Sequence, residues 1–390
     1  MTARLDPDRA ARVVLSRIGE PGDPRLTGLV SELGAEAVLA ALREQGEHGG
    51  LQEDLAARLA RADAGQELER AARQGIRFVT PADDEWPEGL GDLAHAPCLH
   101  ERGGVPVGLW AKGPGGLAGL TGHAVAVVGS RSATTYGAAV AGELAATLGE
   151  AGHTVVSGAA FGIDNAAHRG ALAVDGPTVA VLACGVDRAY PAAHKRLLDY
   201  VADVGVVVSE AAPGCAPTRI RFLARNRLIA AMSQGTVVVE AAIRSGALNT
   251  ANWAAGLSRV LMGVPGPVTS APSAGVHQLI RVRGALLVTD GHDVLEAVGP
   301  AGAHTQGHRQ EAARPRDLLT VEQRQVLDAV PVARGARSAQ IAHAAGLAPH
   351  RVEAALLGLH ATGFVEHAGG RWRLAGETPS RLAEDQPAPS

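Results

Sequence analysis

The residues with the clearest capacity for chemistry lie in one stretch, residues 218–227. It holds four arginines, a phenylalanine and an asparagine: Arg219, Arg221, Phe222, Arg225, Asn226 and Arg227. Arginine guanidinium groups contact phosphates, and an aromatic ring offers a base a stacking surface. This combination therefore predicts a groove for a single nucleic-acid strand. A charge run is more often only a solvated helix face. Here it leads directly into the apolar Leu228-Ile229-Ala230, which favours the binding interpretation.

A second candidate site is a glycine–serine turn, Gly129-Ser130-Arg131, which follows an apolar run. A turn of this kind, leading into a helix, offers backbone N–H groups to an anion, and Arg131 adds a forked phosphate donor. Ser157-Gly158 follows the next apolar run, so we expect it to complete the same anion cradle. The turn lacks the Gly-x-Gly-x-x-Gly spacing and the chain has no Gly-Lys dipeptide. A dinucleotide fingerprint and a Walker A loop are therefore excluded.

Asp164 and His168 are spaced one helical turn apart. Asp164 lies where a helix is predicted to begin, so we expect it to act as the N-cap. The two side chains could also pair as a catalytic base and its orienting group. No serine or cysteine nucleophile has a matching position, so we predict a structural Asp–His hydrogen bond instead.

Two glutamates, Glu210 and Glu240, also follow apolar runs, with Ser245-Gly246 a few residues further on. A carboxylate at the end of an all-valine strand is costly unless it is paired. We predict an ion pair between Glu240 and Arg225 or Arg227, and a supporting role for Glu210, Ser245 and Gly246. Catalysis by the two glutamates is the enzymatic alternative, which we consider weaker because structural networks also perturb carboxylates.

The elements that must position these residues are short β-branched runs alternating with alanine-rich helices, from about Ile76 to Gly299. The runs are apolar throughout, as parallel strands buried on both faces are, and they predict a doubly wound α/β sheet. Ligands bind beyond the carboxyl ends of such strands, where the candidate residues lie. The predicted strands are residues 125–128, 154–156, 178–182, 206–208, 236–239 and 260–264.

The rest of the chain divides by pattern into further segments. Residues 1–74 have helical spacing and predict a small helical domain before the 75–300 core. Residues 301–316 form a polar linker. Residues 317–374 predict a winged helix, with Gly346 at the turn of a helix-turn-helix. Residues 375–390, rich in acids and prolines, predict a disordered tail.

The composition and net charge of the chain exclude further classes of protein. A formal charge of −4 over 390 residues argues against coating nucleic acid by net charge, although it permits a local basic groove. Cys98, Cys184 and Cys215 are few and far apart, which predicts neither a disulfide framework nor a metal site. The first residues lack a signal core, and no apolar run approaches the ~20 residues of a membrane helix. We expect a soluble, cytoplasmic protein without membrane association.

Taken in order, these pieces resemble the DprA/Smf family of bacterial DNA-processing proteins over about residues 75–300. Each piece is short, and the resemblance rests on their joint occurrence at the ends of successive strands. They are Val128-Gly129-Ser130-Arg131, Ser157-Gly158, Gly162-Ile163-Asp164, Ala167-His168-Arg169-Gly170-Ala171-Leu172, Tyr190-Pro191, Ser209-Glu210, Phe222, Arg225-Asn226-Arg227-Leu228-Ile229-Ala230, Val239-Glu240-Ala241, Ser245-Gly246 and Val264-Pro265-Gly266.

The resemblance implies an extended Rossmann fold that dimerises, binds single-stranded DNA and has no catalytic residues, cofactor or metal. It also implies loading of RecA recombinase and displacement of single-strand-binding protein during natural transformation, with a helical, SAM-like N-terminal domain and a C-terminal winged helix. The sequence departs from the family at Phe161, where Lys or Arg is usual, and at His194, where Asn is frequent. We expect Phe161 to stack a base in place of the lost cationic contact.

Two other functions remain open. One is a nucleotide-processing enzyme on a related fold, such as a phosphoribohydrolase of the lysine-decarboxylase-like family. Its Pro-Gly-Gly-x-Gly-Thr-x-x-Glu motif is missing, because Gly235-Thr236 is followed by three valines before Glu240. The other is a ligand-sensing regulator whose winged helix reads duplex DNA.

Overall fold

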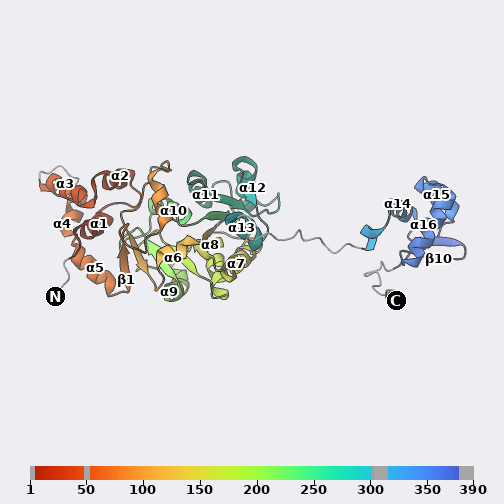
Figure 1. The fold of residues 1–390 in the computed structure, drawn as a ribbon, viewed down its shortest axis with the longest axis horizontal. Helices are drawn as coiled ribbons and strands as arrows, with labels where there is room; N and C mark the ends of the chain where they lie inside the picture. Colours follow the sequence, from red (N-terminus) through yellow and green to blue (C-terminus); the bar gives the residue numbers. More distant parts are fainter. Residues whose placement is uncertain (1–4, 48–52, 301, 303–314, 377–390) are drawn as a thin grey trace. The chain divides into compact units, whose positions relative to one another are not determined.

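The computed structural model describes residues 5–47, 53–300, 302 and 315–376. The chain forms two compact units, residues 1–305 and 306–390, and each is described by itself. The first unit contains a nine-stranded sheet with helices on both faces (Figure 1).

The sheet has the strand order β1-β2-β6-β5-β4-β3-β7-β8-β9. The strands from β6 to β9 in this order are mutually parallel, while β1 and β2 pair antiparallel at one edge. From β3 the chain winds outward through β4, β5 and β6, then returns to pair β7 on the other side of β3. This reversal creates a switch point beside β3. The bounds are β1 Ile76–Val79, β2 Leu109–Lys112, β3 Ala124–Val128, β4 Thr154–Ser157, β5 Thr178–Val181, β6 Val206–Ser209, β7 Gly235–Val238, β8 Val260–Gly263 and β9 Leu286–Leu287.

The predicted α/β class and all six predicted strands are confirmed, and β1, β2 and β9 are additional. The apolar runs are buried on both faces because alternate side chains enter different layers. In β3, Ala124, Ala126 and Val128 pack in one core cluster, while Val125 and Val127 pack in the other.

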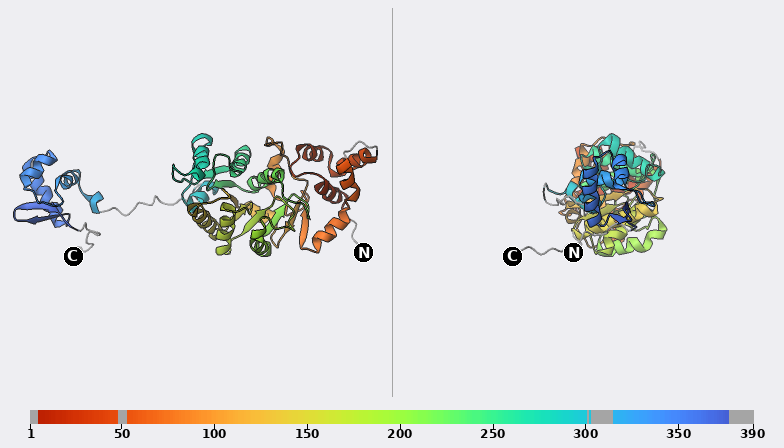
Figure 2. Two further views of the ribbon diagram at one scale, coloured as in Figure 1. Left: turned by 180° about the vertical axis from the view of Figure 1, so that it is seen from behind. Right: turned by 90° about the vertical axis from the view of Figure 1, so that its right-hand side faces the viewer.

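Helices cover the two faces of the sheet as separate layers (Figure 2). The layer formed by α7, α8 and α13 packs on the Val125 side of β3. The layer formed by α10, α11 and α12 packs on the Val128 side. The bounds are α6 Leu117–Gly122, α7 Thr135–Glu150, α8 Ile163–Ala173, α9 Lys195–Val204, α10 Arg219–Ala231, α11 Ala247–Gly256, α12 Ala271–Arg283 and α13 Gly291–Val298, with short 3-10 helices at Glu88–Ala94 (η1) and Ala192–His194 (η2).

Five helices precede the sheet among the residues described before β1, in the segment for which the sequence predicts helices. They are α1 Pro7–Ile18, α2 Pro24–Leu33, α3 Ala35–Glu47, α4 Glu53–Arg61 and α5 Ala64–Ala72. They have an apolar cluster of their own that includes Leu15 and Leu39. Val13 and Ala71 pack instead with Trp110 of the sheet, so these helices belong to the same compact unit as the sheet.

In the second unit, the described residues form a short 3-10 helix and three α-helices, followed by an antiparallel two-stranded hairpin. Gly346 ends α15 in the left-handed region at φ 68°, where the sequence places the turn of a helix-turn-helix. The order of helices and strands in this unit matches the prediction, and the winged-helix assignment itself stays a prediction. The bounds are η3 Pro315–Leu318, α14 Val321–Ala329, α15 Ser338–Ala345, α16 Pro349–Ala361, β10 Val365–Ala368 and β11 Arg371–Leu374.

Most of the predicted linker and nearly all of the predicted tail lie outside the described residues. Among the helices that the structure describes, none is both long and apolar enough for a bilayer span. Cys98, Cys184 and Cys215 are free thiols.

Candidate nucleic-acid interface

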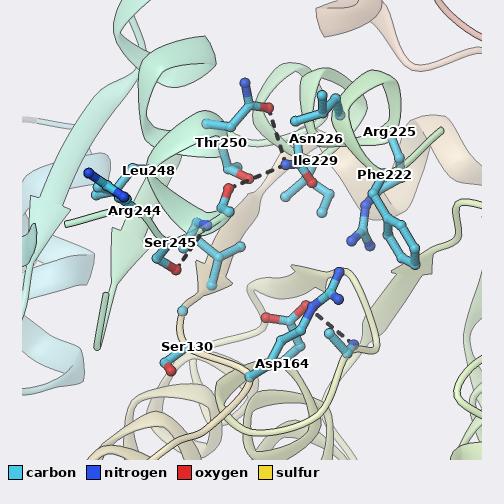
Figure 3. A pocket seen from close by; sticks show the side chains of 18 of the residues that line it. Ser130, Asp164, Phe222, Arg225, Asn226, Ile229, Arg244, Ser245, Leu248 and Thr250 are labelled. Atoms are coloured by element: carbon cyan, nitrogen blue, oxygen red, sulfur yellow. Dashed lines mark hydrogen bonds between the residues drawn. The ribbon is translucent and has the colours of Figure 1, made fainter. Parts of the chain in front are cut away.

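The carboxyl ends of β3, β4 and β7 border a pocket of about 1070 Å³ (Figure 3). The loop after β3, the first turns of α10, and the β7–α11 loop form most of its walls. Asp164 is the single acidic side chain among the described residues that line it. The cationic and aromatic residues lining it are Arg131, Arg219, Arg225, Arg244, Tyr190 and Phe222.

Planar side chains gather around Phe222 on one wall of the pocket. The guanidinium carbon of the exposed Arg131 lies 4.7 Å from the centre of the Phe222 ring, and that of Arg225 lies 5.9 Å from it. The Tyr190 ring centre is 5.6 Å from that of Phe222. A ring attracts cations to its face, so Phe222 holds two guanidinium groups close together despite their like charge.

Arg225 reaches the pocket from a buried position (Figure 3), with only 5% of the residue exposed. One Nη1–H donates to the carbonyl oxygen of Val181 at 2.6 Å, and the guanidinium lies directly on Gly158. A Cβ at residue 158 would fall 1.9 Å from Nη1, so this packing requires glycine. Gly158 therefore supports Arg225 rather than lining the pocket.

The charge of Arg225 is poorly neutralised. Burial lowers its pKa to about 10, the nearby charge of Asp164 opposes the change, and Arg131 adds to it. Its buried Nε–H has no acceptor among the described residues. A buried cation in this state favours the approach of an anion.

Asp164 occupies the backbone cradle that the sequence predicts for a phosphate. Its carboxylate accepts a hydrogen bond from the N–H of Ala160 at 3.3 Å. Burial raises the pKa of Asp164, while Arg225 and the N–H groups of Ala160, Gly129 and Gly158 oppose that rise. The predicted backbone cradle thus serves a protein carboxylate. The predicted N-cap role of Asp164 is wrong, because Gly162 is the N-cap of α8.

The carboxylate of Glu240 lies at the N-terminus of α7. It accepts hydrogen bonds from the N–H of Thr134 at 2.9 Å and from the hydroxyl of Thr134 at 2.6 Å. It also packs against Gly137 in the first turn of α7, where a Cβ would lie 2.3 Å from the carboxyl carbon. The predicted ion pair between Glu240 and Arg225 or Arg227 is therefore wrong. Negative charge at a helix N-terminus is favourable, which explains the burial of Glu240.

Two of the four arginines in the basic stretch point away from the pocket. Arg227 is fully buried and forms a forked ion pair with Glu210, at 2.7 and 2.8 Å. Arg221 forms a similar pair with Glu20, at 2.8 and 3.0 Å. Both residues were predicted to contact DNA, and the structure instead uses them to fix α10 from behind. Arg219 and Arg225 are on the pocket side.

Ser157 and Phe161 also lie outside the pocket. The buried Ser157 hydroxyl donates to the carbonyl oxygen of Val127 at 2.7 Å and so joins two strands. Phe161 is 48% exposed, contacts the His194 ring at a centroid distance of 4.7 Å, and lines a separate groove along α7 and α8. The prediction that Ser157 completes the anion cradle is therefore wrong. Phe161 lies away from the cradle, and its stacking on a base stays a prediction.

His168 is a buried structural residue. Its Nδ1 pairs with the hydroxyl oxygen of Thr178 at 2.8 Å, so the predicted bond to Asp164 is wrong. Burial lowers the pKa of His168 to about 3, and the charges of Arg225 and His194 contribute in the same direction. His168 is therefore neutral at physiological pH.

The other predicted residues do come together at the pocket. Ser130, Asn226, Ser245 and Gly246 line it with the residues named above. Asn226 donates through Nδ2 to the side-chain oxygen of Asn249 at 3.2 Å, which ties α10 to α11 (Figure 3). Sequence reasoning missed Arg244 as a site residue, although it follows a strand and directly precedes Ser245-Gly246.

A doubly wound sheet whose switch point carries arginine and aromatic side chains defines a Rossmann-like protein with a cationic pocket at the carboxyl ends of its strands. The family model described as DNA recombination-mediator protein A matches residues 77–299. The chain belongs to this family, the DprA/Smf family of DNA-processing proteins.

Individual relatives agree with this assignment. The chain is 45% identical over 377 residues to a putative DNA processing protein DprA of Mycobacterium tuberculosis, covering 95% of each chain. It is 42% identical over 213 residues to DNA processing protein DprA of Streptococcus pneumoniae, covering 55% of this chain and 71% of that one. The X-ray structure of DprA from Streptococcus pneumoniae matches with a TM-score of 0.60 and 33% identity, covering 74% of this chain and 96% of that one.

Proposed function

We propose that this protein binds single-stranded DNA in the arginine-lined pocket and performs no chemistry on it. The observation that carries the proposal is Arg225, a buried and poorly neutralised cation beside Phe222 and Arg131. Arginines supply phosphate contacts, and the Tyr190–Phe222 pair offers a stacking surface for bases, which is how single strands are held without sequence readout.

The carboxylates favour this proposal over the nucleotide-processing enzyme. Nucleotide phosphates bind to backbone N–H groups of strand-to-helix turns in Rossmann-like folds, but here Asp164 accepts from the N–H of Ala160 in the turn before α8, and Glu240 accepts from the N–H of Thr134 at the start of α7. Glu210, the other candidate catalytic acid, is engaged by Arg227. The remaining positive charge is carried by side chains spread along the pocket wall, which suits several phosphates of a strand.

We extend the proposal to the cellular role of the family. In this role the protein acts in the cytoplasm as a homodimer, receives incoming single strands during natural transformation, displaces single-strand-binding protein and loads RecA recombinase. These steps follow from the family resemblance, and each needs its own assay. Strand exchange by RecA on single strands coated with single-strand-binding protein should accelerate when the protein is added.

The decisive experiment compares binding of single-stranded and duplex oligonucleotides by fluorescence anisotropy over a range of salt concentrations. We expect a strong preference for single strands. The logarithm of the affinity should fall with the logarithm of salt concentration with a slope of roughly −2 to −4, as expected for a few neutralised phosphates. Equal binding to duplex, or affinity that does not depend on salt, would refute the proposal. Release of base from nucleotides by the wild-type protein, lost in Glu210→Gln or Glu240→Gln, would favour the enzyme.

A further inference from the structure

The face of α10 that points away from the pocket is held by the turn between α1 and α2, residues 19–23. Both carboxylate oxygens of Glu20 accept hydrogen bonds from Arg221, at 2.8 and 3.0 Å. The Arg221 side chain is only 13% exposed and that of Glu20 is 38% exposed. The pair therefore joins the N-terminal helices to the first turn of α10 in a partly shielded setting.

A second connection lies two turns further along α10. The N–H of Gly22 donates to Oε1 of Glu210 at 3.1 Å, and the same carboxylate holds Arg227. Arg17 of α1 also donates to the carbonyl oxygen of Pro213, in the segment that leads into α10. Helix α1 and the α1–α2 turn thus support α10 at two points on the side that faces away from the pocket.

The side chain of Arg225 lies between the α1–α2 turn and the pocket. A cavity of about 10 Å³ behind α10 is lined by Pro21, Glu210 and Arg221 together with Arg225, which also lines the pocket. Any displacement of the turn therefore changes the packing on one side of Arg225, while the other side of Arg225 faces the pocket.

The beginning of α10 needs such support because its charges oppose the helix dipole. The first turn carries Arg219 and Arg221 and has no acidic residue, although negative charge is what stabilises a helix N-terminus. The hydrogen bond that caps this helix is also long, since the hydroxyl of Thr218 accepts from the N–H of Arg221 at 3.3 Å. Glu20 supplies the missing negative charge from another part of the chain.

We propose that Glu20 is a positioning residue for DNA binding: through Arg221 it holds the first turns of α10 so that Phe222 and Arg225 face the pocket. This inference rests on the proposed function, because it assigns the N-terminal helices a role in the affinity of the same pocket. Glu20 itself lies behind the helix and contacts no DNA.

The test is Glu20→Gln in the full-length protein, compared with Glu85→Gln. Glu85 forms an equally forked pair with Arg77, at 2.7 and 2.8 Å, on β1. We expect Glu20→Gln to weaken single-strand binding roughly two- to fivefold, the scale of a partly shielded ion pair, and to leave the salt slope unchanged. The control should bind as the wild type does. Without DNA, amide hydrogen exchange in residues 219–226 should accelerate in Glu20→Gln only.

The exchanged pair Glu20→Arg with Arg221→Glu should restore much of the affinity, which a general loss of stability would not allow. Unchanged or tighter binding by Glu20→Gln would overturn the inference. Tighter binding with a steeper salt slope would mean that the released Arg221 contacts DNA directly. If the wild type fails to bind single strands, the proposed function fails, and the exchange measurement alone decides whether Glu20 positions α10.

Discussion

Replacing Arg225 with methionine separates stability from DNA binding. Burial lowers the pKa of Arg225 from its ordinary value to about 10. At 1.36 kcal/mol per pKa unit, the folded protein carries a cost of about 3 kcal/mol for holding this charge without DNA. Methionine removes the charge and keeps most of the volume, but it loses the charge-assisted hydrogen bond to Val181, which contributes about 1.5–3 kcal/mol.

We therefore expect Arg225→Met to change the free energy of unfolding by less than about 2 kcal/mol in either direction, because the relief of the buried charge is offset by the lost hydrogen bond and by the loss of a cation beside the buried Asp164. Single-strand affinity should fall by about 1–3 kcal/mol, because a charge-assisted phosphate contact is lost. The affinity loss is measured by anisotropy and the stability by urea unfolding on the same preparations.

Arg227→Met is the matched control, since it makes the same substitution two residues further along α10. It leaves the Glu210 carboxylate buried without its cation, so the free energy of unfolding should fall by about 3–5 kcal/mol. The reasoning is refuted if Arg225→Met is strongly destabilised yet binds normally. In that case Arg225 is a structural residue like Arg227, and the pocket is not the binding site.

Three further predictions follow from the same structure. Arg131→Ala and Phe222→Ala should each weaken single-strand binding by about 1–3 kcal/mol, measured by anisotropy, whereas a purely structural Phe222 would lose stability and keep its affinity. Truncation after residue 315 should leave most single-strand affinity intact, and abolished binding would move the site to the C-terminal unit. His168 has a pKa of about 3 when folded and 6.5 when unfolded, so the unfolded chain binds the extra proton as the pH falls. The free energy of unfolding should therefore decline by about 1.4 kcal/mol per pH unit below pH 6.5, partly offset at the acid end by the raised pKa of Asp164, and His168→Gln should remove that decline in urea titrations.

The fold could be predicted from the sequence where a segment has only one favourable environment. An unbroken run such as 124–128 must be buried on both faces, and β3 is. The strands that were missed lack this signal. β1 contains Arg77, β2 ends at Lys112, and β9 has only two residues, both half exposed. Their positions depend on pairing with neighbours far away in the sequence.

The candidate site was predicted as a region but not residue by residue. Composition identifies the basic stretch, but the surroundings of each arginine decide its role. Arg219 and Arg225 line the pocket, whereas Arg221 and Arg227 are paired with Glu20 and Glu210. The spacing of these arginines along the helix does not separate the two groups, so the sequence alone cannot tell which arginines line the pocket. The answer depends on the positions of Glu20 and Glu210, which lie in distant segments.

The same logic explains how a chain with a net charge of −4 presents a cationic pocket. Four carboxylates lie close to α10 and the strand ends, and each has another partner. Asp164 and Glu240 accept hydrogen bonds from backbone N–H groups of strand-to-helix turns, while Glu20 and Glu210 neutralise arginines behind α10. Of these four acids, Asp164 interacts with a pocket arginine, Arg225, while the other three are held by donors outside the pocket, so the lining of the pocket keeps an excess of positive charge. Net charge is therefore a poor guide to the ligand of this protein, and the placement of its acids is the better one.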